Sequence, residues 1–189
     1  MDVIKLSQKA VNSAQKIIED GGVVIFPTDT VYGFLADAGN KKAVDKIYKI
    51  KKRPKSKPLA VFVKDFKIAK ELAEINEKQE KIMKKKWPGK YTFILKRKSV
   101  KLFDGGKNTI AIRIPKHKLL NSLLKKINKP LVQTSVNISG EPILTKISDI
   151  LAKFATSDVA MLIIDGGDLK KRGVSRIIDL TSKTLTRIR

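Results

Sequence analysis

Short apolar runs alternate with amphipathic segments along almost the whole chain, and this alternation is the strongest constraint on its fold. In the amphipathic segments, apolar residues recur every three to four positions, which is typical of helices with one buried face. Helices interleaved with buried strands predict an α/β domain. The predicted strands cover residues 23–26, 59–63, 92–95, 109–114, 131–136, 159–164, 176–180 and 185–188. The predicted helices cover residues 7–20, 40–53, 65–86, 116–127 and 147–154.

The sheet is expected to be twisted, with helices packed on it, and to mix parallel with antiparallel strands. Few residues separate the last three predicted strands, so part of the sheet should be antiparallel. The first ten residues look polar and helix-like, without the hydrophobic segment of a signal peptide. No linker, repeat or low-complexity segment interrupts the pattern. We therefore predict a single α/β domain over residues 1–189.

Composition excludes several classes of protein. No apolar run approaches the ~20 residues that span a bilayer, so no membrane association is predicted. The chain has no cysteine, which excludes disulfides and thiolate metal sites and makes the cytoplasm the expected location. His117 is the single histidine, so a histidine-based metal site is excluded too, and no metal site built by the protein is predicted. His117 is a candidate general base, but a structural role at a helix start is favoured.

The net charge of +23 makes nucleic-acid binding a candidate function, because clustered lysine and arginine neutralise phosphates. We favour a simpler interpretation, in which the whole chain is generally basic. With seven arginines among 41 basic residues, 41 − 7 = 34 are lysines, and these are spread along the chain. A general basicity explains that pattern better than a dedicated nucleic-acid surface does. The rarity of arginine is more useful, because each one is a candidate for bidentate anion recognition.

Two stretches far apart in the chain have the chemistry of a nucleotide-phosphate site. Residues 51–54, KKRP, offer three cations in four positions. Residues 135–140, SVNISG, offer hydroxyls, an amide and a glycine turn directly after a predicted buried strand. Phosphates require positive charge together with short donors and a backbone that approaches closely. We predict that the fold brings these stretches together, although neither a Walker A sequence nor a G-x-G-x-x-G fingerprint is present.

A third polar segment follows the first predicted strand. Residues 26–33, FPTDTVYG, run from the strand into a proline turn that carries hydroxyl side chains and a carboxylate. Ligands usually lie at the carboxyl ends of strands in α/β sheets. Taken alone, the segment is best explained as a capped turn whose own Thr and Asp side chains satisfy it.

Six motifs in this order resemble the YrdC-like family: PTDTVYG, KKRP followed by KPL, WPGKYT, AIRIPKH, TSVNISG and GVSRIID. Members of that family are threonylcarbamoyladenylate synthases, which join L-threonine, bicarbonate and ATP into threonylcarbamoyl-AMP and release pyrophosphate. Other proteins use this intermediate to modify an adenosine beside the anticodon of certain tRNAs. The resemblance implies the short, single-domain form, with downstream threonylcarbamoyl-transfer proteins as partners and Mg²⁺ accompanying ATP.

The resemblance also implies roles for individual residues. Lys51 and Arg53 match the pair that acts on the departing pyrophosphate, and bidentate arginine beside a point charge suits that task. The residues implied for ATP are Lys51, Arg53, Lys57, Thr109, Ser135, Asn137 and Arg189. Those implied for L-threonine are Thr30, Tyr32, Arg113 and Ser175. The simpler interpretations are a solvated helix end around residues 51–53 and a solvent-facing Arg113.

Two competing functions stay open from the sequence. One is a non-catalytic module of the same fold that binds double-stranded RNA or tRNA through phosphate contacts. The other is a divergent family member that acts on a different carbamate, because Phe62 stands where many members have histidine. Lys90 and Arg176 are further departures from the common motifs, and neither belongs to the implied phosphate set.

Overall fold

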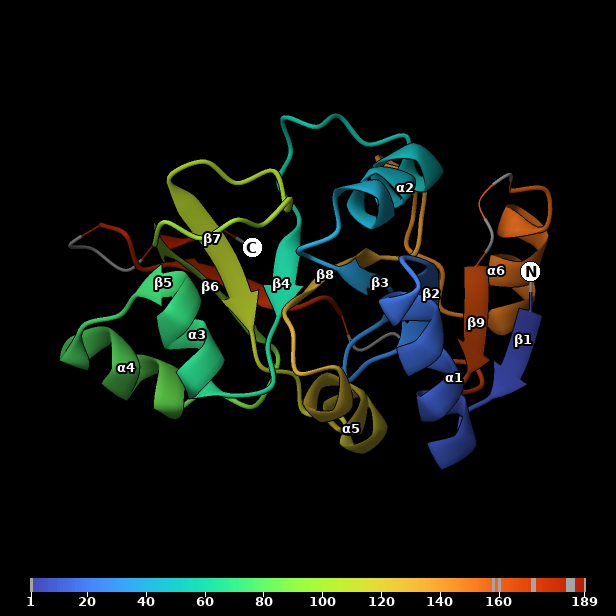
Figure 1. Ribbon diagram of the computed structural model, residues 1–189, viewed down its shortest axis with the longest axis horizontal. Coiled ribbons are helices and arrows are strands. Elements are labelled where there is room, and N and C mark those ends of the chain that lie inside the picture. Colours follow the sequence, from blue (N-terminus) through green and yellow to red (C-terminus); the bar gives the residue numbers. More distant parts are fainter. Residues whose placement is uncertain (1, 158, 160, 171–172, 183–185, 189) are drawn as a thin grey trace.

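The computed structural model describes residues 2–157, 159, 161–170, 173–182 and 186–188. Within these residues one mixed sheet runs through the molecule, with helices on both of its faces (Figure 1). The strands are β1 (Asp2–Lys5), β2 (Val23–Pro27), β3 (Tyr32–Asp37), β4 (Ala60–Phe62), β5 (Ala73–Glu74), β6 (Tyr91–Arg97), β7 (Thr109–Arg113), β8 (Leu131–Ser135), β9 (Met161–Asp165), β10 (Arg176–Asp179) and β11 (Thr186–Arg187). The helices are α1 (Gln8–Glu19), α2 (Lys41–Lys51), α3 (Phe66–Leu72), α4 (Glu77–Lys84), α5 (Lys118–Ile127) and α6 (Ile147–Phe154).

Five helices begin at a residue whose side chain accepts a hydrogen bond from the first turn. Such caps satisfy backbone N–H groups that have no partner within the helix. The cap at Ser7 was predicted and is confirmed, and His117 performs the same task, with Nδ1 3.2 Å from the backbone nitrogen of Leu120. This contact supports the structural interpretation of the histidine. The five caps are Ser7, Asn40, Asp65, Asn76 and His117.

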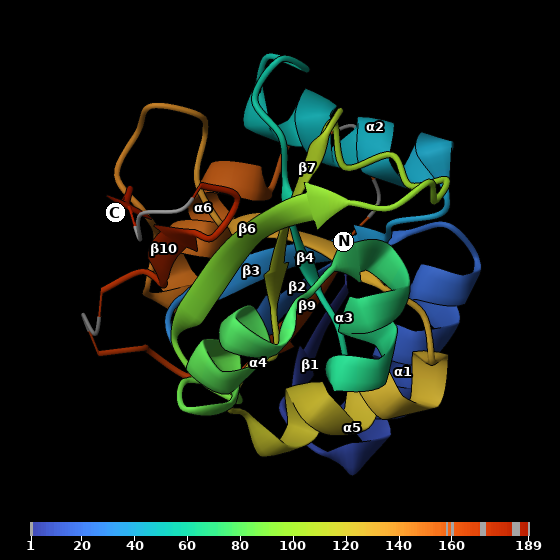
Figure 2. The ribbon, with the colours of Figure 1, turned by 90° about the vertical axis from the view of Figure 1, so that its left-hand side faces the viewer.

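The sheet separates two hydrophobic clusters because its central strands bury both faces. In β2, Val23 and Ile25 pack with α2 and α6, whereas Val24 and Phe26 pack with α1 and α5. A third cluster lies between β6, β7 and the α3–α4 pair, which Figure 2 shows beside those strands. Strands buried on both faces appear in the sequence as continuous apolar runs, which explains why these runs were recognised.

The predicted mixed sheet is confirmed, but the reason given for it is only partly right. Of the last three strands, only β10 and β11 are antiparallel neighbours. β9 lies far from both, between β1 and β2, and is parallel to each. Most antiparallel pairing comes instead from β2–β3, β3–β8, β4–β8 and β6–β7. Short connections between strands therefore did not decide which strands became neighbours.

Three of the strands were not predicted: β1, β3 and β5. The N-terminal residues, predicted to be helix-like, form β1, which pairs in parallel with β9 at the edge of the sheet. As an edge strand, β1 pairs with a single strand, and the residues with which it pairs lie some 160 positions further along the chain. Its short sequence gives no local sign of that pairing. β3 was not predicted because its sequence, YGFLAD, contains small residues and is buried along almost its whole length, which removes any polar alternation.

The long helix predicted over residues 65–86 is wrong. Two helices, α3 and α4, occupy this stretch, and they are separated by β5. The backbone becomes extended at Ala73, which pairs with Arg97 of β6. A new helix then begins at Asn76, whose side chain forms a reciprocal capping box with Gln79. That local signal was present in the sequence and marks a helix start.

Candidate active site

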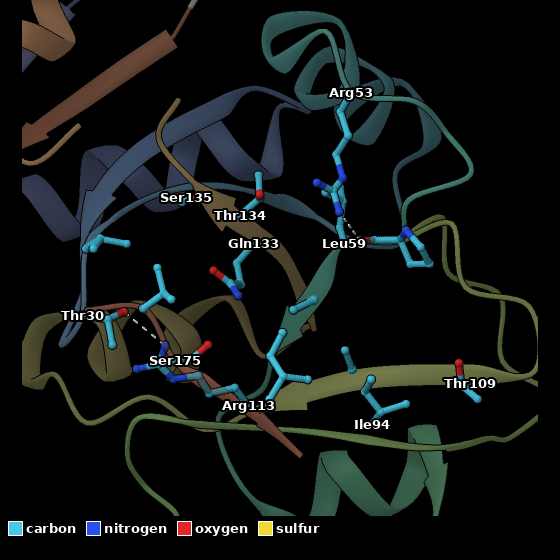
Figure 3. Close-up of a pocket in the computed structure, with 16 residues that line it drawn as sticks. Thr30, Arg53, Leu59, Ile94, Thr109, Arg113, Gln133, Thr134, Ser135 and Ser175 are labelled. Carbon is cyan, nitrogen blue, oxygen red and sulfur yellow. Dashed lines mark hydrogen bonds between the residues drawn. The ribbon is translucent and has the colours of Figure 1, made fainter. Parts of the chain in front are cut away.

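A cavity of about 300 Å³ opens where the β2–β3 turn meets the ends of β4, β7 and β8 and the edge of β10 (Figure 3). Its wall combines apolar surface with hydroxyl, amide and guanidinium groups. Arg53 lies on one side of the cavity and Arg113 on the other, with Gln133, Thr134 and Ser135 of β8 nearby. Six of the predicted site residues line it: Thr30, Arg53, Thr109, Arg113, Ser135 and Ser175.

The predicted convergence of residues 51–53 with residues 135–137 is confirmed. Lys51 Nζ lies 2.6 Å from the carbonyl oxygen of Ser135, 2.9 Å from that of Asn137 and 2.8 Å from Asn137 Oδ1. The backbone also joins the two segments, because Ser139 N donates to the carbonyl oxygen of Lys51 at 2.8 Å. The end of α2 therefore holds the loop that follows β8.

Lys51 is a buried cation that is only 1 % exposed. Burial, and then the positive charge of Arg53, lowers the pKa of Lys51 to about 7. Three close acceptors need three N–H donors, which only the protonated amine supplies, so this geometry describes the charged form. Lys51 does not line the cavity described above. The predicted direct contact of Lys51 with a nucleotide phosphate stays a prediction. What the structure shows is that Lys51 donates hydrogen bonds to Ser135 and Asn137.

Arg53 reaches the cavity from a turn just after α2. Lys52 adopts a left-handed conformation (φ 49°) that ends the helix, and Pro54 follows Arg53 directly. Arg53 Nε donates to the carbonyl oxygen of Lys57 at 2.9 Å, and Nη2 donates to that of Pro58 at 2.8 Å. These bonds fix the guanidinium plane while leaving further N–H groups for an anion. Lys57 itself is exposed and does not line the cavity.

Arg113, at the end of β7, is buried and not solvent-facing. Its Nε donates to the carbonyl oxygen of Gly89 at 2.9 Å, Nη1 to Thr30 Oγ1 at 3.2 Å and Nη2 to Asp29 Oδ1 at 2.6 Å. Burial lowers the pKa of Arg113, and the charge of Asp29 opposes that shift. The guanidinium thereby connects the β2–β3 turn to the WPGK loop, and its remaining N–H groups border the cavity.

Ser175 presents a donor to the cavity. Thr92 Oγ1 donates to Ser175 Oγ at 3.0 Å, and both residues are buried. Since the Ser175 oxygen accepts this bond, its own proton is available for a ligand. Together with Arg113, it offers donors of the kind that a carboxylate requires.

Tyr32 holds a loop and does not line the cavity. Its hydroxyl donates to the carbonyl oxygen of Gly167 at 2.7 Å and accepts from Gly166 N at 2.9 Å. Burial raises the pKa of Tyr32 to about 12, so the hydroxyl stays protonated. The predicted contact of Tyr32 with an amino acid stays a prediction, and the observed role is to anchor the segment that leads to Ser175.

We expect Tyr32→Phe to lower the free energy of unfolding by about 1 kcal/mol, because two hydrogen bonds are lost but their partners, Gly166 and Gly167, are exposed residues that can bond water instead. Urea denaturation of the variant and the wild type measures the difference. An unchanged midpoint and slope would show that the hydroxyl does not anchor the loop.

The other predicted residues have varied positions. Asn137 is buried behind the cavity wall, where its side chain accepts from Lys51 and from Ser135 Oγ at 3.0 Å. Arg189 lies outside the described residues. Gln133 and Thr134 line the cavity but were not predicted. Thr134 belongs to the TSVNISG motif, which was a usable signal, whereas no sequence signal distinguished Gln133. Asp29 was noted only as part of a polar turn.

No group of three or more histidine and acidic side chains that could hold a metal occurs among the described residues. In the same part of the chain, no helix combines the length and apolar character needed to cross a membrane.

The fold and the site define a class of α/β proteins with a polar cavity at the strand ends, lined from opposite sides by two arginines. Residues 16–189 match the Sua5/YciO/YrdC family model, described as "Telomere recombination", and the chain belongs to this family. The resemblance found in the sequence is thereby confirmed.

Curated relatives include a threonylcarbamoyl-AMP synthase of Pyrococcus abyssi, 34% identical over 180 residues, which are 94% of this chain and 52% of the relative. A threonylcarbamoyl-AMP synthase of Bacillus subtilis is 36% identical over 170 residues, which are 88% of this chain and 49% of the relative. The chain thus spans about half the length of these curated relatives.

Solved structures with the same fold include P. abyssi Sua5 complexed with L-threonine, with a TM-score of 0.89 and 32% identity over all of this chain and 56% of that one. E. coli YciO has a TM-score of 0.86 and 26% identity, and the match covers all of this chain and 92% of YciO.

Proposed function

We propose that the chain is an L-threonylcarbamoyladenylate synthase, which forms threonylcarbamoyl-AMP and pyrophosphate from L-threonine, bicarbonate and ATP. The observation that carries this proposal is the placement of two fixed guanidinium groups on opposite sides of one cavity. Arg53 suits the phosphates of ATP, and Arg113 with Ser175 suits the carboxylate of an amino acid. The names of the curated relatives and the threonine complex of P. abyssi Sua5 support the same assignment.

In the proposed reaction the amine of threonine combines with bicarbonate to give a carbamate and water. A carbamate oxygen then attacks the α-phosphorus of ATP in line, and the bond to pyrophosphate breaks. No protein nucleophile is required, so the protein contributes positioning and charge stabilisation. Arg53 would stabilise the departing pyrophosphate, while Arg113, Thr30 and Ser175 would hold the amino acid in place.

Mg²⁺ is proposed to enter with ATP. The described residues supply no cage of three acidic or histidine side chains, which suits an ion held mainly by the phosphates. When bound, the ion would neutralise phosphate charge. The hydroxyls of Thr134 and Ser135, which line the same cavity as Arg53, are neutral oxygen ligands that could complete the coordination of the ion.

Threonine-dependent exchange of labelled pyrophosphate into ATP tests the reaction. Purified protein is incubated with ATP, bicarbonate and labelled pyrophosphate, with and without L-threonine. We expect label to enter ATP only when both threonine and bicarbonate are present. Exchange that is the same with and without threonine would contradict the proposed substrate. Exchange that depends on a different amine would show that the protein is a family member acting on a different carbamate.

Arg113→Lys should raise the KM for L-threonine by at least about tenfold and leave the KM for ATP within a factor of about two. Lysine keeps the positive charge, but it has too few N–H groups to donate to Gly89, Thr30 and Asp29 and also to form a bidentate hydrogen bond with a carboxylate. Steady-state kinetics with each substrate varied in turn measures both constants. Equal changes in the KM for threonine and the KM for ATP would mean that Arg113 maintains the structure of the whole cavity and does not bind threonine specifically.

Together with the enzyme activity we propose a role in tRNA modification. The partners would be downstream threonylcarbamoyl-transfer proteins, and the location would be the cytoplasm. The alternative is a module that binds tRNA or double-stranded RNA without chemistry, with which the net charge of +23 is compatible. RNA retention at moderate salt without pyrophosphate exchange would support the module. Exchange with or without RNA binding would support the enzyme.

A further inference from the structure

Two buried arginine–aspartate pairs occur among the described residues, and one of them borders the cavity. Arg113 Nη2 and Asp29 Oδ1 are 2.6 Å apart, with side chains that are 2 % and 9 % exposed. Arg97 and Asp104 form the other pair, also at 2.6 Å, away from the cavity wall. Asp29 Oδ2 is buried and has no hydrogen-bond partner in the protein. Its carboxylate is therefore held by the Arg113 guanidinium through one oxygen only.

Among the described residues, the charges on the side of the cavity lined by Thr30, Arg113 and Ser175 consequently cancel. The positive charge of Arg113 is matched by Asp29. His117 also lies near Asp29, and burial lowers the pKa of this histidine, so the imidazole is neutral at pH 7. Arg53 is the other charged group among the described lining residues, and it lies on the opposite side.

The hydroxyl of Thr30 presents an acceptor to this side of the cavity. Thr28 Oγ1 donates its one proton to the carbonyl oxygen of Val31 at 2.7 Å. The contact of 2.9 Å between Thr28 Oγ1 and Thr30 Oγ1 therefore uses the proton of Thr30. Thr30 Oγ1 already accepts from Arg113 Nη1, which leaves one lone pair for a ligand. Thr30 can thus receive an N–H group of a ligand but cannot donate to it.

We propose that Asp29 determines specificity by neutralising Arg113, so that the cavity selects a zwitterionic α-amino acid over carboxylates that lack an ammonium group. The proposal rests on the function above, in which Arg113 takes the carboxylate of the amino acid. At the binding step, before the amine is carboxylated, a zwitterion adds no net charge and supplies an N–H group for the Thr30 acceptor. A simple carboxylate adds a second negative charge beside Asp29, and like charges placed together at a desolvated site are strongly unfavourable.

Binding of two ligands that differ only in the ammonium group, to wild type and to Asp29→Asn, tests this proposal. Isothermal titration calorimetry compares L-threonine with (R)-3-hydroxybutanoate, which is threonine without its amine. We expect wild type to bind threonine far more tightly. In Asp29→Asn the amide can still accept from Arg113, but the site gains one positive charge. The ratio of the two dissociation constants should therefore shift by about tenfold or more toward the hydroxy acid.

Asp104→Asn is the matched control, because it makes the same isosteric change in the other buried pair. It should keep the wild-type ratio even if it is less stable. A second measurement needs no variant: wild type should also reject L-threoninamide, which carries a net positive charge. Equal affinity of wild type for threonine and the hydroxy acid, or an unchanged ratio in Asp29→Asn, would overturn the proposal. Wild type that binds no threonine would instead contradict the proposed function.

Discussion

Lys51→Met should reduce the rate of adenylate formation by at least about a hundredfold while changing stability much less. The buried ammonium of Lys51 holds the carbonyl oxygens of Ser135 and Asn137 and the Asn137 amide. Methionine has a similar length but cannot donate, so the loop after β8 loses the contacts that position Ser135 at the cavity. A displacement of about 1 Å in such a site costs on the order of a hundredfold in rate.

The effect of Lys51→Met on stability is the balance of two opposing changes. Three acceptors lose their donor, and each unsatisfied acceptor costs about 1–3 kcal/mol when it is fully buried. Against this, the variant no longer buries a charge, and the pKa of Lys51, lowered to about 7 by burial, indicates that this burial is costly. We therefore expect the free energy of unfolding to change by less than about 2 kcal/mol.

Pyrophosphate exchange and urea denaturation of the same preparations measure the two effects of Lys51→Met. Lys42→Met is the matched control, because it changes an exposed lysine on the same helix and should leave exchange within about twofold of wild type. Near-normal exchange by Lys51→Met would show that the ammonium is dispensable. Complete unfolding of the variant would show that Lys51 is required mainly for stability. In that case the exchange rate of Ser135→Ala would test separately whether the loop after β8 contributes to the reaction.

Arg53→Ala should lower the rate of adenylate formation by roughly a hundredfold with little change in the fold. Removing one well-placed charged donor from a site of developing negative charge costs about 3 kcal/mol of transition-state stabilisation. Arg53 is prepared for this task, because two carbonyl oxygens of its own loop already fix its guanidinium. Little reorganisation is then needed when phosphates arrive.

Three comparisons interpret the Arg53 result. Arg53→Lys keeps the charge but loses the planar fork, so it should recover only part of the rate. Lys55→Ala changes an exposed lysine of the same loop, paired with Asp45 at 2.7 Å, and should stay within about twofold of wild type. Thermal denaturation checks that the variants remain folded. Arg53→Ala with the exchange rate of wild type would remove this residue from the phosphate site.

The positions of most helices and central strands could be predicted from sequence because the signals that define them are local. Ser7 and the apolar spacing that follows it define α1, and the continuous apolar run of β2 marks a strand buried on both faces. The break between α3 and α4 was missed although Asn76 and Gln79 carry a local capping box. There the helix-like polar pattern continues across β5 and hides the break.

The KKRP, SVNISG and PTDTVYG segments could be recognised in the sequence as carrying side chains suited to anions, and each contributes a residue to the cavity wall. Tertiary structure decided how these side chains are used. Lys51 meets acceptors 84 and 86 positions away, and Arg113 meets an aspartate 84 positions away. The order of strands in the sheet makes these contacts, through hydrogen bonding between segments distant in sequence. Periodicity and capping report only on neighbours along the chain, so they define elements and candidate groups, while long-range strand pairing decides which groups meet.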